Sequence, residues 1–201
     1  DTNSIMVDQY PKPYTTASQV LVNFDSTDVA NGTGYEDYFL IESEDSGGKD
    51  YHLTPNPDFS NTAYIEQAGA GTKDLDYDLS SFVIPRTING TALISIAGLS
   101  PAGTVTATFT VELYKWDGNT ETQIGSTVTF AKGLLAAGTM LYLRMPIENA
   151  LIPAGESLRL RVSFTNSTGQ TVRYGIDPAG RTSGNFITTT SKISVPYKLD
   201  V

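Results

Sequence analysis

A long stretch of period-two alternation, from Val105 to Phe130, constrains the fold of this chain more than any other feature. Apolar side chains occupy every second position from Val105 to Leu113, and threonines and one glutamate occupy the positions between them. Successive side chains of a strand point to opposite faces, so this pattern predicts one buried face and one solvated face. An Asp-Gly pair, Asp117-Gly118, supplies the positive φ angles of a tight turn before a second run that carries Ile124, Val128 and Phe130. The segment is therefore predicted to be a β-hairpin, because a helix would spread these apolar positions around its circumference.

Similar alternation recurs along the rest of the chain and predicts about eight to ten strands. The fold class expected is all-β, a two-sheet antiparallel sandwich of jelly-roll-like type. Residues 1–17 have no clean period and carry two prolines, so they are expected to form an extended N-terminal arm. Residues 18–201 are expected to form a single β-sandwich domain. Within it, the polar segment 43–61 is expected to be the longest surface loop, and 73–84 one or two strands.

Composition excludes several classes of function. The net charge is −9, with only 13 scattered basic residues, which argues against a nucleic-acid partner. No apolar run reaches roughly 18 residues, so no membrane-spanning helix is expected. The chain has no cysteine, which removes thiol catalysis, zinc-thiolate sites and disulfide bonds.

Three aspartates at alternate positions, Asp74, Asp76 and Asp78, are the candidate metal ligands of the sequence. On a strand their carboxylates share one face, and Ca²⁺ takes six to eight oxygen ligands. The alternative is that Leu75 and Tyr77 point inward and the three acids are simply solvated. No EF-hand spacing follows them, and no cofactor is expected.

Catalytic patterns are weak throughout. His52 is the only histidine, so a nucleophile–base triad would depend on it alone, and it is expected to lie in a loop. There is no Gly-X-Ser-X-Gly elbow and no phosphate-binding glycine loop before a helix. Paired acids around Gly47-Gly48 suit glycoside hydrolysis only if their carboxylates are suitably spaced. The chain is predicted not to be an enzyme.

Aromatic residues are the better candidates for binding. Three aromatic residues, Trp116, Tyr114 and Tyr142, are candidates for exposed rings that stack on a sugar. The alternative for Trp116 is that it caps the hairpin or packs on a neighbouring subunit. In the arm, Tyr10, Pro11, Pro13 and Tyr14 are expected to contact a partner, because aromatic residues in a segment without regular structure suit anchoring; a frayed terminus is the alternative.

Three segments together resemble β-sandwich virion proteins of tailed bacterial or archaeal viruses: VTATFTVELYKWDGNTETQIGSTVTF, IPAGESLRLRVSF and ISVPYKLDV. The resemblance covers roughly residues 100–201. It implies a capsid-decorating, head-fibre or tail-associated protein on the outside of a virion, otherwise extracellular, with no catalytic residues to carry over. The implied partners are the major capsid protein or other virion proteins, in a homo-oligomer such as a trimer. The alternative function is a carbohydrate-binding or host-adhesion module.

Overall fold

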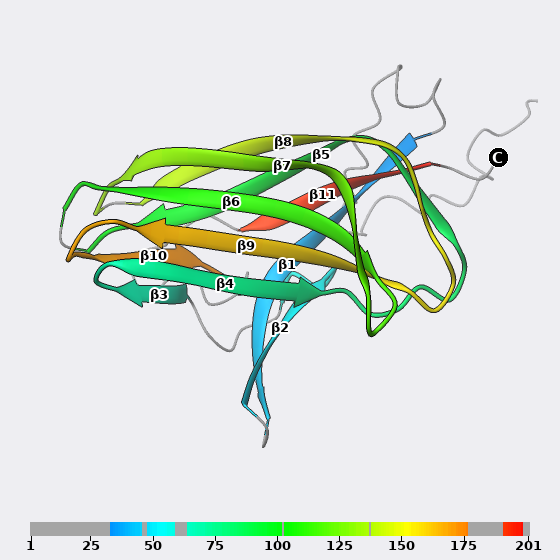
Figure 1. The fold of residues 1–201 in the computed structure, drawn as a ribbon, viewed down its shortest axis with the longest axis horizontal. Helices are drawn as coiled ribbons and strands as arrows, with labels where there is room; N and C mark the ends of the chain where they lie inside the picture. The colour runs from blue at the N-terminus through cyan, green and yellow to red at the C-terminus, as the bar shows by residue number, and fades with distance from the viewer. Residues whose placement is uncertain are drawn as a thin grey trace, which may run out of the picture.

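Strands form every regular element of this chain in the computed structural model, which describes residues 33–45, 48–58, 64–101, 103–136, 138–176 and 191–198 (Figure 1). Within those ranges no helix is long and apolar enough to cross a membrane. The strands are β1 (Thr33–Asp45), β2 (Gly48–Thr54), β3 (Tyr64–Ala68), β4 (Gly71–Asp78), β5 (Arg86–Leu99), β6 (Val105–Trp116), β7 (Glu121–Leu134), β8 (Thr139–Ile152), β9 (Ser157–Asn166), β10 (Thr171–Gly175) and β11 (Lys192–Lys198).

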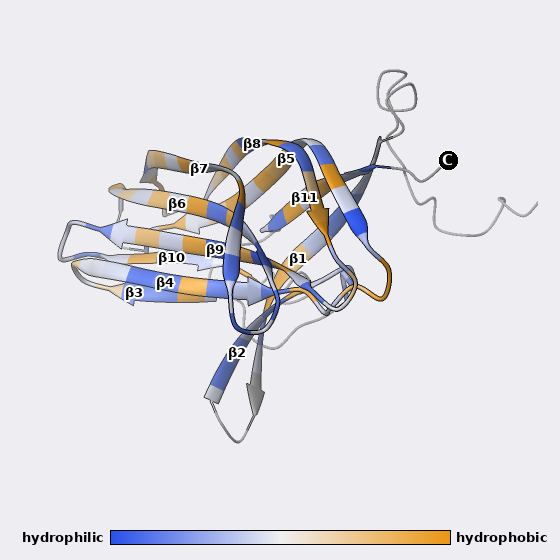
Figure 2. Cartoon of the chain, turned by 45° about the vertical axis from the view of Figure 1, so that its right-hand side comes forward, coloured by the Kyte–Doolittle hydropathy of each residue, from blue (hydrophilic) through white to orange (hydrophobic). Residues whose placement is uncertain are grey.

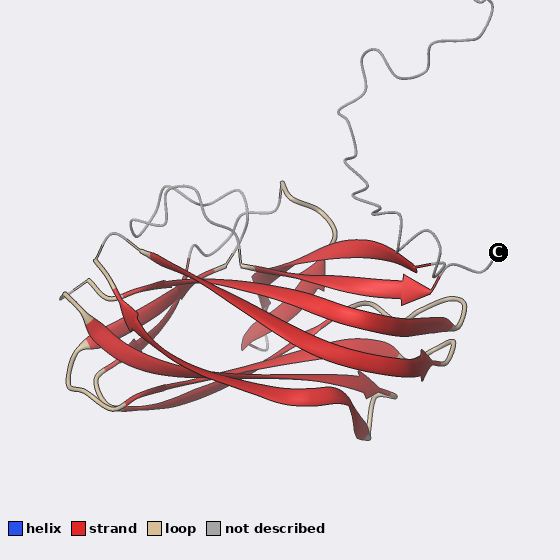
Figure 3. Ribbon diagram, turned by 90° about the horizontal axis from the view of Figure 1, so that it is seen from above, coloured by secondary structure: helices blue, strands red, loops and turns tan. Residues whose placement is uncertain are grey.

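Two layers of strands pack face to face, and most of the strands run along the length of the molecule (Figure 3). One layer has the order β8-β5-β11-β1-β2, with β10 and β3 continuing beside the end of β5. The other layer is β4-β9-β6-β7. Among the described residues all ladders are antiparallel except one parallel bridge, His52 to Asp78, which joins β2 to β4 and links the layers. The predicted all-β sandwich is confirmed.

The β6–β7 hairpin forms as the alternation predicts. Every apolar residue at alternate positions from Val105 to Leu113 is buried, and Ile124 on β7 is buried as well. The carboxylate of Asp117 accepts hydrogen bonds from the backbone N–H groups of Asn119 (2.8 Å) and Thr120 (2.7 Å), and Gly118 has a φ of 95°. These two bonds lower the pKa of the Asp117 carboxyl, because they favour its charged form.

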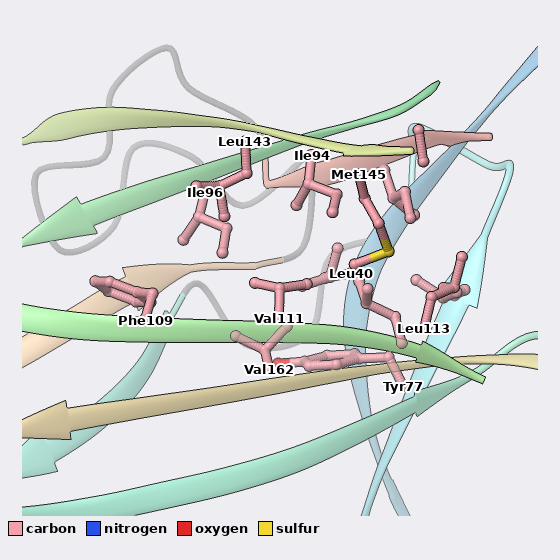
Figure 4. Packing of buried hydrophobic residues seen from close by; sticks show 14 of the residues in the cluster. Leu40, Tyr77, Ile94, Ile96, Phe109, Val111, Leu113, Leu143, Met145 and Val162 are labelled. Atoms are coloured by element: carbon pink, nitrogen blue, oxygen red, sulfur yellow. The ribbon is translucent and has the colours of Figure 1, made fainter. Parts of the chain in front are cut away.

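The core lies between the layers and takes side chains from both (Figure 4). Phe109 and Val111 of β6 face Ile94 and Ile96 of β5 across the interior. Alternation of apolar and polar colours along individual strands in Figure 2 corresponds to this inward and outward pointing. Burial of these side chains at roughly 1.5–3 kcal/mol each is the main force that holds the layers together.

The expected loop at 43–61 is largely wrong. β1 continues to Asp45 and pairs with β2 in an antiparallel hairpin, from Phe39 opposite Thr54 to Asp45 opposite Gly48. This hairpin projects from the body of the sandwich (Figures 1 and 2), and residues 48–50 are exposed. Cross-strand hydrogen bonds therefore order a segment whose end at residues 48–50 is polar and exposed, while Leu53 further along β2 is buried. His52 lies on β2, not in a loop, where its Nε2 is 3.0 Å from the Ser43 hydroxyl.

The interval 73–84 also differs from the expectation, because β4 ends at Asp78 and residues 79–85 connect it to β5. Backbone bonds join Phe82 to the turn before β9: its N–H donates to the Glu156 carbonyl (2.9 Å), and its carbonyl accepts from Gly155 (2.8 Å). Val83 and Ile84 lie just beyond this anchored residue, outside any strand.

An irregularity in the β5–β8 ladder changes which side chains point outward. Leu141, Leu143, Met145 and Ile147 are buried at odd positions, and a register shift between Ile88 and Gly90 follows them. Asn149, with a φ of 42°, donates its N–H to the Asn89 side chain (3.3 Å) at this shift. An extra residue in one strand reverses the parity of the residues after it. Leu151 is consequently exposed and Ile152 buried.

Candidate functional site

The outer face of the β4-β9-β6-β7 layer carries a network of arginines, carboxylates and aromatic rings. Arg159 donates two parallel bonds to the Asp78 carboxylate, at 2.6 and 2.7 Å, and a third to Glu121 at 2.6 Å. Its guanidinium lies over the Trp116 ring, 3.7 Å from the ring centroid. Paired carboxylate binding and ring stacking are the geometry for which a guanidinium is suited.

Arg161 repeats this arrangement on the next row of the sheet. It donates to both Asp76 oxygens, at 2.7 and 2.9 Å, and to both Glu121 oxygens, at 2.9 and 3.0 Å. Its guanidinium lies 4.9 Å from the Tyr114 ring centroid. These two rows form the arginine network, whose members are Asp76, Asp78, Tyr114, Trp116, Glu121, Arg159 and Arg161.

The arginine network connects all four strands of its layer. The hydrogen bonds that Arg159 donates to Asp78 raise the pKa of Arg159 above its ordinary value, and those that Arg161 donates to Asp76 do the same for Arg161, so both guanidiniums stay charged. The side chain of Arg159 is only 13% exposed, which weakens screening by water compared with a surface pair. The network stabilises the layer, and few of its polar atoms are left to bond to a ligand.

This geometry bears directly on the candidate calcium ligands. The carboxylates of Asp76 and Asp78 are engaged by guanidiniums, and Asp74 is exposed at the next outward position of β4. Across the described ranges, no three histidine, cysteine, aspartate or glutamate side chains are arranged to hold a metal ion. The oxygens that a cation would need are thus largely used within the protein.

Trp116 is half-buried, and one face of its indole is occupied by Arg159. A sugar stacking on that face would have to displace a guanidinium that also holds Asp78 and Glu121. Contact of Trp116 with a glycan or a subunit stays a prediction, restricted to whatever part of the ring Arg159 leaves open.

The outer face of the other layer, on β8-β5-β11-β1, carries an exposed aromatic side chain, Tyr142. Tyr142 is 74% exposed and lies opposite Ser95 of β5. Arg144, two residues further along β8, lies opposite Leu93, which is 43% exposed. We call these two rows the Tyr142 face. Because Leu141 and Leu143 point inward, the alternation of the sequence already predicts that Tyr142 between them points outward.

A third surface lies at the end of the sandwich where β5 begins. Val83 is 92% exposed, Ile84 57% and Leu151 53%. The paired residues Arg86 and Ile152 bring the 79–85 connection and the end of β8 to this same end. We call Val83, Ile84 and Leu151 the apolar corner. Sequence patterns did not reveal it, because it depends on where β4 ends and on the bulge before Leu151.

The arm residues Tyr10, Pro11, Pro13 and Tyr14 lie outside the described residues, which begin at Thr33. Their proposed contact with a partner, and the boundary of the arm at residue 17, stay predictions.

Comparison with known proteins gives similarity of fold alone. No family model matches the sequence, and no curated protein sequence matches it. Among solved structures, an aminopeptidase from a marine sediment Thaumarchaeota archaeon is similar with a TM-score of 0.58 at 10% identity, covering 83% of this chain. A CocE/NonD family hydrolase from Staphylococcus aureus (TM-score 0.57, 8% identity, 83% of this chain) and an α-amino acid ester hydrolase (0.54, 11%, 81%) follow. This chain spans only 37%, 37% and 36% of those proteins, respectively.

Proposed function

We propose that this chain is a non-enzymatic structural module of a virion that decorates or stabilises the outer capsid surface by contacting major capsid subunits. The apolar corner is the observation that carries the proposal. Large apolar side chains exposed singly are ordinary, but neighbouring ones gathered at one end of a fold mark protein–protein contact sites. Val83 and Ile84 sit beside an anchored residue, Phe82, so the backbone of the 79–85 connection holds them outward.

The fold supports such a contact role. A sandwich whose strands are tied by long ladders and by the arginine network presents its corner on a stiff support, so little ordering entropy is lost on binding. Virion proteins are present in many copies, and weak contacts at each copy add through avidity. Association of the module with itself, for example as a trimer, would multiply the corner in the same way. The sequence resemblance to virion proteins supports a position on the outer surface of a capsid or tail.

Cosedimentation with purified virus particles from the source tests the proposal. The double variant Val83→Ser, Ile84→Ser should lose particle binding at least tenfold while its melting temperature stays near that of the wild type, because both side chains are exposed. Leu135→Ser is the matched control, since Leu135 is 49% exposed and lies near Ser100, at the opposite end of β5. Equal binding by the double variant and the wild type would remove the corner from the function.

The alternative, a carbohydrate-binding or host-adhesion module, draws on a different surface. Its observation is the exposed ring of Tyr142 in place of Trp116, and the next subsection develops it.

A further inference from the structure

The Tyr142 face has a regular arrangement of side chains across four strands. One row runs Tyr142, Ser95, Lys192, Phe39, and the adjacent row runs Arg144, Leu93, Ser194, Asp37. The three strand spacings of about 4.8 Å make each row about 14 Å long. That length accommodates a short extended ligand lying across the strands.

Tyr142 and Arg144 are the residues of this face whose polar groups are available to a ligand. Neither the Tyr142 hydroxyl nor the Arg144 guanidinium has a hydrogen bond or ion pair within the described part of the chain, and both side chains are exposed. Arg159 and Arg161 differ in this respect, because each of those guanidiniums is held by an aspartate and by Glu121. Since the two residues are separated by one position on β8, they point to the same side about 7 Å apart.

The far end of the face is polar and already ordered. The Asp37 carboxylate accepts from the Lys192 ammonium and from the Ser194 hydroxyl. Asp37 and Lys192 remain 43% and 35% exposed, so each has capacity for a further hydrogen bond to a ligand. The face thus combines one open ring, one open cation and a fixed polar cluster.

We propose that the Tyr142 face binds an acidic glycan, a chain of sugars of which at least one carries a carboxylate. A sugar ring packs its C–H face on Tyr142, because an aromatic ring offers a flat apolar surface with a negative face. Its carboxylate pairs with Arg144, whose fork of N–H donors matches a carboxylate in charge and shape. Hydroxyl groups of the next sugars bond to Asp37, Lys192 and Ser194.

The chemistry of the face favours a sugar over a protein partner. A protein interface is built around a buried apolar core with aromatic anchors, and the apolar corner is closer to that description. On the Tyr142 face the exposed ring lies beside Arg144 and Ser95, and Lys192, Ser194 and Asp37 follow across the strands, which suits a ligand rich in hydroxyls. The apolar side chains of the two rows are Leu93, which is partly exposed, and Phe39, which is half-buried. Glycan binding uses none of the apolar corner, so it goes beyond the proposed capsid contact and can fail independently of it.

Isothermal titration of the full chain with matched pairs of oligosaccharides tests the inference. The pairs are trigalacturonate with galactotriose, which differ in the carboxylates at C6, and sialyllactose with lactose, which differ by one acidic sugar. Binding of at least one acidic member is expected, at least tenfold tighter than its neutral counterpart. Tyr142→Ala should weaken it at least tenfold, Tyr142→Phe should retain it, and Arg144→Gln should abolish the preference for the acidic member.

Two controls separate this site from the others. The double variant Val83→Ser, Ile84→Ser should bind the acidic sugar as the wild type does, and every variant should keep the wild-type melting temperature. Absence of binding to both acidic sugars at millimolar concentration, or wild-type affinity in Tyr142→Ala, overturns the site. Equal affinity for acidic and neutral members overturns the acidic class of ligand.

Discussion

Phe109 is a fully buried side chain that contacts rings from both layers of the sandwich. It stacks on Phe164 with 5.8 Å between ring centroids and meets the edge of Tyr174 at 6.3 Å. Replacing it by alanine leaves a cavity that rigid strands cannot close, so Phe109→Ala should lower the free energy of unfolding by about 3–5 kcal/mol. Denaturant unfolding measures this, with Thr106→Ala on the exposed face as the control. A shift near zero would mean that the inward face of β6 is misassigned.

Gly125 shows how closely β7 approaches β8. Its φ is 73°, and a Cβ built there would lie 2.9 Å from the Pro146 carbonyl oxygen, a backbone atom that side-chain movement cannot displace. Gly125→Ala should therefore destabilise the protein by about 1–3 kcal/mol, from the strained backbone and the clash together. Gly133→Ala on the same strand is the matched control, because its Cβ would meet only a Thr104 methyl at 3.5 Å. Equal melting temperatures for the two variants would contradict this reading of the β7–β8 approach.

At the scale of strands, the arginine network is expected to hold the β4-β9-β6-β7 layer together. Removing Arg159 leaves Asp78 without its paired donor and Trp116 without its covering cation. Arg159→Gln should cost about 1–3 kcal/mol, less than for a fully buried pair because water reaches the network. A double-mutant cycle of Arg159→Gln and Asp78→Asn should show a coupling free energy above about 0.5 kcal/mol. The control cycle of Lys132→Gln, an exposed residue of β7, with Asp78→Asn should show no coupling. Additive effects of Arg159 and Asp78 would mean that the pair is only a surface contact.

The sequence predicts the positions of most strands, but it does not predict which strands are neighbours in the fold. Alternation located β6, β8 and β9, because burial of one face leaves a period of two in any strand. It did not reveal β2, whose residues 48–50 are exposed. The Arg159–Asp78 pair joins residues 81 positions apart, and nothing in local spacing indicates that β4 and β9 are neighbours. From the sequence, the three aspartates could be either metal ligands or simply solvated, and neither alternative included the arginine partners that Asp76 and Asp78 have.

Of the two proposed binding surfaces, the sequence predicts one in part and does not predict the other. The outward direction of Tyr142 follows from its buried neighbours Leu141 and Leu143, so that part of the candidate site was within reach of the sequence. The sequence could not predict the apolar corner, because a backbone irregularity at Asn149 turns Leu151 outward.

For the whole molecule, buried tyrosines set the stability at high pH. Tyr77 and Tyr174 are fully buried with their hydroxyls 2.6 Å apart, and burial raises the pKa of each above the ordinary 10.0. Burial is also the main cause that raises the pKa of Tyr38 and Tyr197. In the unfolded chain these phenols ionise near pH 10, while in the folded chain they keep their protons. The unfolded state then binds fewer protons, so stability is fully present below pH 10 and falls above it.

Each phenol that stays protonated should lower the free energy of unfolding by about 1.4 kcal/mol per pH unit above its ordinary pKa. Tyrosinate absorbance and far-ultraviolet circular dichroism, followed together in an alkaline titration, measure the effect. The last phenols should ionise in the same step in which the strand signal is lost. Smooth ionisation of all tyrosines with the strand signal intact would contradict the burial of these four.

Electron cryomicroscopy of purified source particles would show whether the apolar corner makes the capsid contact. We expect density for a two-layer sandwich on the outer surface, with Val83, Ile84 and Leu151 turned toward major capsid subunits and the Tyr142 face turned to solvent. Particles that lack this density, or a sandwich whose apolar corner faces solvent, would contradict that contact.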